Sequence, residues 1–332
     1  MRRREFIRIF GGAVAACPLA VRAQQRLGQM RRIGVLMTTA ADDAQGQVRY
    51  AAFVQGLQQL GWEVGANVRI DTRWGAGDTE RYHTYVEELI ALKPDIVLAT
   101  ANSVVAEFQK ASHTVPIVFV TTIDPVGSGL VISLARPGKN ATGFIAFEFS
   151  LNAKLLELLK EVAPNVERVG VVYDPFVPAG SAGFAAIQTA ASSFNIELSP
   201  ISTHDANEIE PDITELARRP NSGLIVVGPP SSISLNKRDL IVKLAIQHRL
   251  PSICATLAFV STGALISYGS NQLADYRRAA GYVDRILRGE RPADLPVQAP
   301  TKYQLIVNVK TAKAMGLTIP PTLLARADEV IE

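Results

Sequence analysis

The chain reads RIGVLMT at residues 32–38, and it reads RVGVVYD at residues 168–174. Each stretch is a short apolar run rich in β-branched residues, which predicts a buried strand. Later landmarks repeat in the same order: PDIVLA at 94–99 is echoed by PNSGLIVVG at 220–228, and VPIV at 115–118 by LPSI at 250–253. The first and second landmarks are 63 residues apart in one half and 55 in the other, so we infer two copies of one topology.

Predicted strands alternate with predicted helices along both halves. Apolar residues at helical spacing predict a helix that ends at Gly61, and similar segments follow other strands. We expect strands at 33–37, 68–74, 95–99, 116–120, 264–268 and 304–309, and helices at 80–92, 104–111 and 273–287. This alternation implies right-handed βαβ crossovers and parallel sheets covered on both faces. The predicted fold class is α/β, with two similar doubly wound parallel-sheet lobes.

The length of 332 residues also favours two lobes, because it exceeds what one hydrophobic core usually serves. We expect the chain to cross between the lobes three times, near residues 142–148, 263–271 and 289–296. This division assigns residues 31–143 plus 269–289 to the first lobe and residues 144–268 plus 290–332 to the second. Three crossings would act as a hinge.

Composition and charge exclude several classes of protein. The chain is 48% hydrophobic and 20% charged and has two cysteines, so it is neither disordered, collagen-like nor a disulfide scaffold. Its net charge of +3 comes from residues 1–23, which hold five arginines and one acid. The remaining chain has 29 basic and 30 acidic residues, so we expect no nucleic-acid partner.

Residues 1–23 predict an export signal. An arginine-rich head precedes a short apolar run, and Val21-Arg22-Ala23 suits signal peptidase. The pair Arg3-Arg4 before apolar residues resembles a twin-arginine signal. The alternative is a lipid anchor at Cys17. The apolar run is about half of the ~20 residues that a spanning helix needs, and no later stretch reaches that length. We therefore expect a periplasmic protein whose mature chain does not insert into the membrane.

Enzyme, cofactor and metal motifs are missing from the sequence. No Gly-x-Gly-x-x-Gly follows the first strand, there is no phosphate-loop lysine, and Ser181 lacks the glycine of a nucleophile elbow. The four histidines are far apart, so we expect no metal site, and we expect Cys254 to be a small buried hydrophobe. We predict a protein that is not an enzyme and has no cofactor. The enzymatic alternative uses Asp124 or Glu148 as a general acid or base.

Parallel sheets bind ligands beyond the carboxyl ends of their strands, where loops and helix N-termini meet. In this sequence those positions are polar but barely charged, which favours recognition over catalysis. The predicted ligand-binding residues before the first crossing and at it are Thr38, Thr39, Asn102, Ser103, Thr121, Thr122, Asp124, Phe147 and Glu148. Those that follow are Tyr173, Asp174, Gly228, Pro229, Tyr268 and Asn271.

Each polar residue has a chemical role and a purely structural alternative. Asn102 and Ser103 stand where a helix begins, so they would hold a carboxylate together with free backbone N–H groups. Helix capping is the alternative for them. Asp124 or Glu148 would pair with an ammonium group, but Asp124 precedes Pro125, and a turn or cap is the alternative there.

Aromatic residues would supply a flat apolar wall. We expect Tyr173, Phe147 and Tyr268 to form it. For Tyr173 the alternative is packing at the edge of the core. Together with the polar strand ends, this wall predicts a small solute that is gripped between the lobes and not transformed.

Five motifs resemble one protein family. They are GVLM at 34–37, AFVQGL at 52–57, DPVG at 124–127, LARPGKNATG at 134–143, and the tail from YVDRIL at 282–287 through LLARADE at 323–329. As a set they are similar to ABC-transporter substrate-binding proteins of the tryptophan/tyrosine-uptake type. The resemblance covers essentially all of the chain after the signal. It implies the type I periplasmic binding fold, with two lobes joined by a three-crossing hinge.

The resemblance also implies a function. It implies capture of a small solute, an amino acid or an aromatic derivative, and its delivery to an ABC permease and the permease's ATPase. In such folds the loops at 101–103 and 228–230 line the pocket. The alternative function is a periplasmic sensing module that presents its closed form to a membrane receptor.

Overall fold

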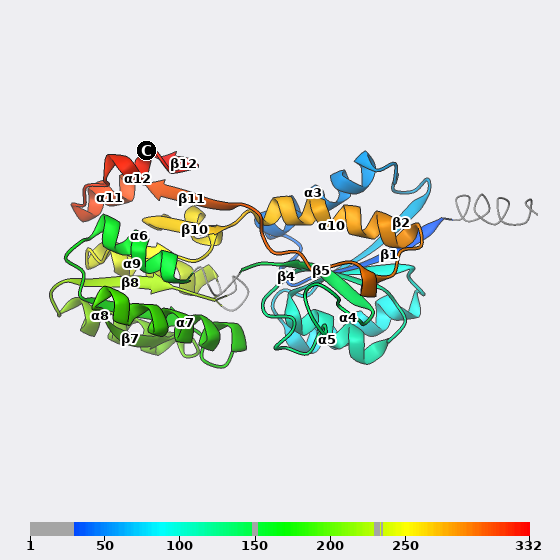
Figure 1. The fold of residues 1–332 in the computed structure, drawn as a ribbon, viewed down its shortest axis with the longest axis horizontal. Helices are drawn as coiled ribbons and strands as arrows, with labels where there is room; N and C mark the ends of the chain where they lie inside the picture. Colours follow the sequence, from blue (N-terminus) through cyan, green and yellow to red (C-terminus); the bar gives the residue numbers. More distant parts are fainter. Residues whose placement is uncertain (1–29, 148–151, 229–232, 234) are drawn as a thin grey trace, which may run out of the picture.

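The computed structural model describes residues 30–147, 152–228, 233 and 235–332, and these form two lobes arranged side by side along the long axis (Figure 1). Each lobe contains one largely parallel sheet with helices packed on both faces. The predicted fold class is thus confirmed. Among these residues, none of the helices has the length and hydropathy that a membrane crossing requires.

The first lobe holds a five-stranded sheet whose neighbouring strands are all parallel. Its elements are β1 (Arg31–Met37), α3 (Ala44–Gln59), β2 (Val68–Trp74), α4 (Thr79–Ala91), β3 (Ile96–Thr100), α5 (Ala101–Ala111), β4 (Ile117–Thr122), β5 (Ala141–Ile145), α10 (Gln272–Leu287) and the 3-10 helix η4 (Pro292–Asp294). The strand order is β2-β1-β3-β4-β5. Helices α3 and α10 bury one face of the sheet, and α4 and α5 bury the other.

The second lobe repeats this order and extends it. Its elements are α6 (Asn152–Val162), β6 (Arg168–Tyr173), α7 (Pro178–Phe194), β7 (Glu197–Ser202), α8 (Ala206–Ala217), β8 (Ser222–Val226), α9 (Leu235–Gln247), β9 (Ser252–Cys254), the 3-10 helix η3 (Leu257–Thr262), β10 (Ile266–Ser270), β11 (Tyr303–Asn308), α11 (Val309–Met315), α12 (Pro321–Leu324) and β12 (Glu329–Ile331). The order β7-β6-β8-β9-β10 matches the first sheet, and β11 and β12 are added beside β10. Only β11 runs antiparallel to its neighbour β10 among the described strands.

The glycine of the repeated motif has the same packing role in both lobes. A Cβ at Gly34 in β1 would lie 3.1 Å from a Val97 methyl group and 3.6 Å from Leu89 of α4. A Cβ at Gly170 in β6 would lie 2.5 Å from a methyl group of Leu216 in α8. In each lobe the missing side chain lets a helix lie close to the first strand, which explains why the motif recurs.

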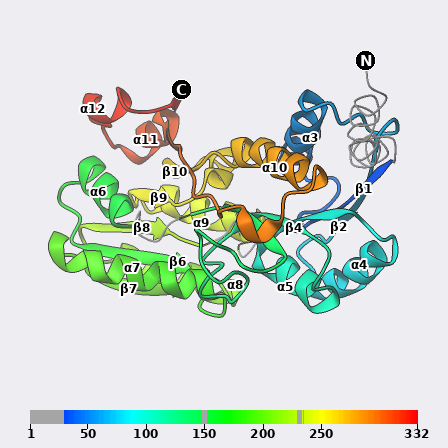
Figure 2. The same cartoon turned by 45° about the vertical axis from the view of Figure 1, so that its right-hand side comes forward.

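Helix α10 comes from late in the chain, yet it packs along α3 of the first lobe (Figure 2). The two helices approach closely at Gly56, where a Cβ would lie 2.8 Å from the Cβ of Ala280. Tyr276 and Val283 of α10 are buried in the same apolar core as Phe53 of α3. The first lobe is therefore complete only when this C-terminal helix has returned to it.

The chain crosses between the lobes in three places. The first connection joins β5 to α6, and the second is at Asn271, between β10 and α10. We expected the third crossing at residues 289–296, but the structure places it after residue 298. Thr142 Oγ1 donates a hydrogen bond to Leu295 O (2.6 Å), and Gln298 N donates to Gly143 O (2.9 Å). These bonds hold residues 295–298 against β5, so the second lobe resumes later than residue 290.

The connections also determine which edges of the sheets face each other. Strand β5 is parallel to β4 and leads directly into the first connection, so the carboxyl ends of the first-lobe strands point toward the second lobe. Strand β10 is parallel to β9, and its last residue, Ser270, pairs with Tyr303 at the start of β11. Both residues adjoin connections to the first lobe. The carboxyl ends of the parallel strands therefore face one another, which is the geometry in which such sheets bind ligands.

Candidate functional site

Backbone strain is concentrated at the carboxyl ends of the first-lobe strands. Eight non-glycine residues of the described part have positive φ angles. Four of them lie between a helix and the next strand: Lys93, Asn195, Asn221 and Arg249. The other four lie at or just beyond the ends of β2, β3 and β4: Ala76 (53°), Ala101 (69°), Thr121 (57°) and Asp124 (44°). Such conformations cost about 1–3 kcal/mol each and cluster at functional sites.

Thr38 and Thr39 follow β1, as predicted, and the buried Thr100 at the end of β3 positions them. Thr38 N donates to Thr100 Oγ1 (2.9 Å), and Thr100 Oγ1 donates to Leu36 O (3.1 Å). Thr39 lies against the start of α3, because a Cβ at Gly46 would overlap its hydroxyl. The strand ends of β1 and β3 are thus joined by side-chain hydrogen bonds.

Buried oxygen atoms without hydrogen-bond partners gather at the same edges. Thr122 at the end of β4 is fully buried, and its Oγ1 has no partner among the described residues. The same holds for side-chain oxygens of Thr39, Asn152, Thr203, Ser267 and Gln272, of which all but Ser267 lie at a strand end or a connection. Asp71 Oδ2 and Arg168 Nε, at the opposite edges, also lack a hydrogen bond, but both lie in ion pairs. Unsatisfied buried groups are rare in native proteins, so their concentration here marks these edges as the candidate site.

Thr121 and a residue of α10 meet at the end of β4. The Thr121 hydroxyl interacts with that of Tyr276, and burial raises the pKa of Tyr276 to about 12. This pKa keeps the phenol neutral at physiological pH. Tyr276 was not among the predicted site residues, because its helix comes from the C-terminal part of the chain.

Asn102 has a structural role in this structure. Its Nδ2 donates to Ile123 O (2.7 Å) and Ser128 Oγ (2.8 Å), and its Oδ1 accepts from Ile123 N (2.9 Å). The amide therefore holds the loop after β4 and has no donor left for a carboxylate. Ser103 is exposed in the first turn of α5, where the N-cap Thr100 makes no side-chain capping bond. Carboxylate binding at this helix start would therefore depend on Ser103 and backbone N–H groups.

Asp124 forms a turn, which was the alternative to pairing with an ammonium group. Its Oδ1 accepts a hydrogen bond from Gly127 N (2.9 Å), and its backbone oxygen accepts one from Ser128 N (3.0 Å). A Cβ at Gly127 would overlap the Asp124 carboxylate, which explains the sequence DPVG at this turn. The Asp124 side chain is exposed.

The first strand of the second lobe ends in residues that are already engaged. Tyr173 stacks on Phe184, with ring centroids 4.9 Å apart and an interplanar angle of 14°, so it packs at the edge of the core. Asp174 Oδ1 accepts a hydrogen bond from Phe176 N (3.0 Å) and shapes the following turn. Gly228 follows β8 and has a φ of 108°, a backbone conformation that residues with a Cβ atom rarely adopt.

Two predicted residues near the second connection also have structural contacts. Tyr268 lies inside β10, opposite Leu305, and stacks on Tyr303 with ring centroids 5.7 Å apart. It therefore lies below the strand end and not at it. Asn271 caps α10, since its Oδ1 accepts a hydrogen bond from Ala274 N (3.2 Å).

Three predicted residues remain, two in the first connection and one after β8. Phe147 is half-buried and follows β5 by two residues. Glu148 and Pro229 lie outside the described residues. Ligand contacts by these three residues stay predictions.

An exposed aromatic pair at the strand ends of the second lobe was missed by sequence reasoning. Phe176 follows β6 and is 72% exposed. Its ring centroid lies 4.3 Å from that of His204, which follows β7. Exposed rings at such a position can stack on a flat solute. The signal in the sequence for these two residues was that each lies only two or three positions after the end of a strand.

Two arginines were missed because only the loops at the strand ends were considered. Arg49 is half-buried on α3, and Arg238 lies in the first turn of α9. Both helices begin at the facing edges, so these edges carry more charge than we expected. The signal for Arg49 was its place four residues before Phe53, on the apolar face of the predicted helix.

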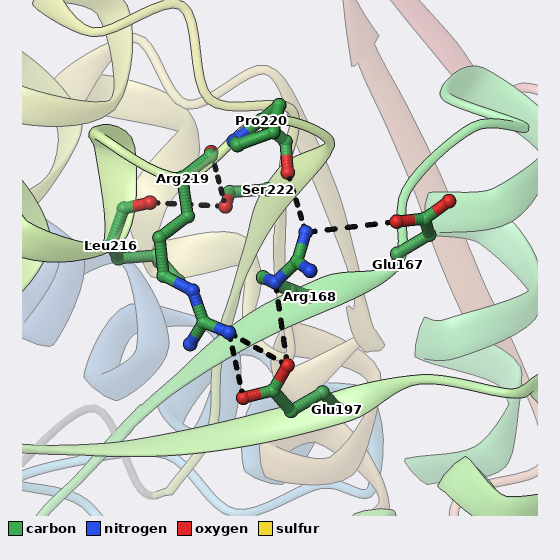
Figure 3. Close-up of polar contacts among 7 residues, drawn as sticks. All are labelled: Glu167, Arg168, Glu197, Leu216, Arg219, Pro220 and Ser222. Carbon is green, nitrogen blue, oxygen red and sulfur yellow. Dashed lines mark hydrogen bonds and ion pairs between the residues drawn. The ribbon is translucent and has the colours of Figure 1, made fainter.

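The opposite, amino-terminal edge of the second sheet has a different character (Figure 3). Arg168 contacts Glu197 (3.3 Å) and Glu167 (3.6 Å) and donates to Pro220 O (3.0 Å). Arg219 donates to both carboxylate oxygens of Glu197, at 2.8 and 2.9 Å. This network pairs every charge that it contains, so it is complete without a ligand.

The amino-terminal edge of the first sheet is built in the same way. Arg31 pairs with Asp95 (2.7 Å), and both Arg32 (2.9 Å) and Arg69 (3.2 Å) pair with Asp71. A pocket of about 390 Å³ opens there, but its three arginines already have acidic partners. We therefore place the candidate site at the carboxyl ends of the strands and not at this pocket.

Groups for metal or thiol chemistry are not assembled in the described part of the chain. In that part of the chain, no group of three or more His, Cys, Asp or Glu side chains is placed to hold a metal ion. Cys254 is buried in β9, and burial raises the pKa of its thiol far above its usual range. This burial opposes formation of the reactive thiolate.

Comparisons with known proteins support this fold. A tyrosine-binding protein of Clostridioides difficile (strain R20291) is 24% identical over 265 residues, which are 80% of this chain and 75% of that protein. A conserved domain protein of Vibrio cholerae is 26% identical and superposes with a TM-score of 0.82, over 91% of this chain and 100% of its own. An ABC domain from Streptococcus pneumonia in complex with L-Trp is 24% identical and superposes with a TM-score of 0.82, over 91% of this chain and 100% of its own.

The family described as ABC transporter substrate binding protein matches residues 33–331. This range contains all but the first residues of the two lobes, all three connections and every described residue of the candidate site. The description of this family is that of a solute-binding component of ABC transporters. The chain therefore belongs to the ABC transporter substrate-binding protein family.

Proposed function

We propose that this protein is the exported solute receptor of an ABC importer, which binds an aromatic amino acid or a related solute between its lobes and delivers it to a membrane permease. Family membership supports solute binding. The relatives named for tyrosine and solved with L-Trp support an aromatic amino acid. The arginine-rich signal predicted in residues 1–23 supports a place outside the cytoplasmic membrane.

The observation that carries this proposal is the state of the facing strand ends. They combine the strained Ala101 and Thr121 with buried hydroxyls that lack partners, such as that of Thr122. Strain and unsatisfied groups persist where function requires them. The exposed ring of Phe176 beside His204 adds a stacking surface from the second lobe. Polar groups from one lobe and an aromatic surface from the other suit a zwitterionic aromatic solute.

Lobe closure would connect binding to transport. The three connections allow the lobes to rotate while each sheet stays intact. A solute that touches both edges binds the closed arrangement better than the open one, so it shifts the population toward closure. The permease would then recognise the closed form.

Calorimetry and thermal unfolding of the purified protein test the proposal. The panel contains the twenty amino acids, aromatic carboxylic acids, and glucose as a control from another solute class. We expect L-tyrosine or L-tryptophan to stabilise the fold by about 2.7 kcal/mol at a hundredfold excess over Kd. Glucose is expected to leave the unfolding temperature unchanged. A correctly folded sample that no aromatic member of the panel stabilises would contradict the proposal.

A further inference from the structure

Arg278 of α10 lies where the three connections leave the first lobe. Its Cζ is 4.7 Å from the centroid of the Phe144 ring in β5, the strand that leads into the first connection. Its Nη2 donates a hydrogen bond to Gln298 Oε1 (3.4 Å), in the segment that leads into the third connection. Its Nη1 donates to Asp275 Oδ1 (3.2 Å), in the first turn of α10 after the second connection. One half-buried side chain thus contacts the first-lobe ends of all three connections.

Backbone hydrogen bonds already join two of these ends. Gln298 N donates to Gly143 O, and Ile145 N donates to Gln298 O, both at 2.9 Å. Ala146 N donates to Thr122 O (2.7 Å), so the start of the first connection is also bound to β4. The ends of the first and third connections therefore extend the first-lobe sheet and move as part of it.

Side chains on one face of α10 join the second connection to this extension. Tyr282 packs against Phe144 with ring centroids 4.9 Å apart, and its hydroxyl donates to Pro296 O (2.7 Å). Asp275, Arg278 and Tyr282 are separated by three and four residues, so they share a helix face. Of the two side chains that reach across, that of Arg278 comes from a position nearer to the second connection. Its loss would therefore loosen the helix where the chain enters it.

The environment of Arg278 makes these contacts stronger than those of an exposed arginine. Asp275 is 5% exposed, and a buried carboxyl group needs donors or a cation. A guanidinium over an aromatic ring is stabilising, and more so where water is displaced. Partners in three segments fix the position of the side chain, so it joins these segments as a rigid strut.

We infer that Arg278 is a positioning residue of the hinge, which binds the first-lobe ends of the three connections into one base and thereby limits the orientations that the solute-free lobes sample. This inference rests on the proposed function, because closure on a solute gives the base its role. Lobes that sample fewer open orientations lose less entropy on closing, so the solute binds more tightly. Arg278 therefore raises affinity without touching the solute.

Distances between the lobes of the solute-free protein test the base directly. Spin labels at Thr84→Cys on α4 and Asp212→Cys on α8, both at exposed positions, report the separation of the lobes by double electron–electron resonance. The labelled protein also carries Cys17→Ser, and the buried Cys254 stays unlabelled. We expect Arg278→Met to broaden the distance distribution.

Arg285→Met is the matched control on the same helix. Arg285 also lies over an aromatic ring, that of Tyr282 (5.7 Å), and it pairs with Glu290 (2.7 Å). Neither partner is the end of a connection, so this variant should keep the width of the parent distribution.

Calorimetry with L-tyrosine and L-tryptophan measures the consequence for binding. We expect Arg278→Met to weaken the binding of the better of these two probes by about 3- to 30-fold. Arg285→Met should stay within about twofold of the parent. Arg278→Lys keeps a cation that can lie over the Phe144 ring, so it should recover part of the affinity and narrow the distribution again.

A second variant covers the case in which Arg278→Met does not fold. Gln298→Ala removes one partner of Arg278 but keeps the backbone bonds of residue 298, and it should broaden the distribution in the same direction. If L-tyrosine or L-tryptophan binds the parent but the width or the affinity of the folded variant is unchanged, the inference fails and the proposed function stands. If no member of the panel binds the parent but the distribution broadens, the base stands and the proposed function fails.

Discussion

At the amino-terminal edge of the second sheet, Arg168 and Arg219 share the carboxylate of Glu197 (Figure 3). At the carboxyl-terminal edge of the first sheet, Arg49 forms no hydrogen bond or ion pair with another described residue, and Thr122 Oγ1 is buried without a hydrogen bond. The two kinds of edge therefore satisfy their polar groups in opposite ways. Paired charges stabilise the fold, and incompletely satisfied groups remain where a ligand can complete them.

The repeated motif explains why the amino-terminal edges are alike. Arg32 begins the first copy and pairs with Asp71 on β2, while Arg168 begins the second and pairs with Glu197 on β7. In both lobes the acid comes from the neighbouring edge strand. The carboxyl-terminal edges differ, because positive φ angles of non-glycine residues occur there only in the described part of the first lobe. The two lobes are therefore alike at their amino-terminal edges and different at their carboxyl-terminal edges.

The largest expected effect is the pH dependence that Asp275 gives to the free energy of unfolding. It lies in the first turn of α10, is 5% exposed, and burial raises its pKa to about 6, against the opposing effect of Arg278. The unfolded chain loses this proton near pH 3.8. Its contribution to stability is therefore complete below that pH and is lost as the pH rises to about 6, by up to about 3 kcal/mol.

Urea unfolding between about pH 4 and 7 measures this loss. In Asp275→Asn the free energy of unfolding should fall less over this range than in the parent protein. Asp239→Asn, at an exposed position on α9, is the control and should keep the parent slope. Identical slopes for Asp275→Asn and the parent would show that this carboxyl is not held neutral by the fold.

Breaking the amino-terminal network should cost stability and leave binding intact. Arg168→Met removes contacts with two glutamates and the Pro220 carbonyl, so we expect a loss of about 2 kcal/mol in the free energy of unfolding. Arg218→Met breaks only an exposed pair with Glu215 and should change it by less than about 0.5 kcal/mol. If Arg168→Met also weakened solute binding, the amino-terminal edge would contribute to binding and this prediction would be wrong.

Phe176→Ala should weaken binding and leave the stability of the fold unchanged. The ring is 72% exposed, so its removal should hardly change the unfolding temperature. We expect binding of an aromatic ligand to weaken about tenfold, or about 1.4 kcal/mol, through loss of stacking. Phe176→Tyr keeps the ring and should keep the affinity. Calorimetry that finds equal affinity for the Ala variant would remove Phe176 from the site.

Ala101→Gly should show the smallest effect, a gain in stability. Its φ of 69° is unfavourable for alanine but not for glycine, so we expect about 0.5–1 kcal/mol of stabilisation. Ala106→Gly, in the middle of the same helix, should instead destabilise by about 1 kcal/mol. If both substitutions destabilise alike, the strain at the end of β3 is not a property of the folded chain.

Much of the fold followed from local patterns. The predicted strands at 33–37 and 95–99 match β1 and β3 closely, and the helix predicted at 273–287 matches α10. Among site residues, Thr38, Thr39, Thr121 and Thr122 lie at strand ends as predicted. Strand and helix periodicities report burial of neighbouring residues, and this information is contained in each short segment.

The chemical state of the site could not be predicted in this way. From the sequence alone, Asn102 is a plausible ligand contact. In the fold its side chain donates hydrogen bonds to Ile123 and Ser128, which lie 21 and 26 residues later in the chain. The position of the third crossing depends on β5, which pairs with the segment around Gln298.

The sequence by itself determined two similar α/β lobes, the succession of strands and helices along the chain and the loops that follow the strands, because hydrophobic periodicity acts over a few residues. Only the tertiary structure decided which polar groups at those loops are already satisfied and which are not. Arg238 shows the reason: the charges that act on it include those of Asp43 and Arg49, which the other lobe contributes. Hydrogen bonds and ion pairs join groups that folding brings together, so their completion is a property of the folded protein.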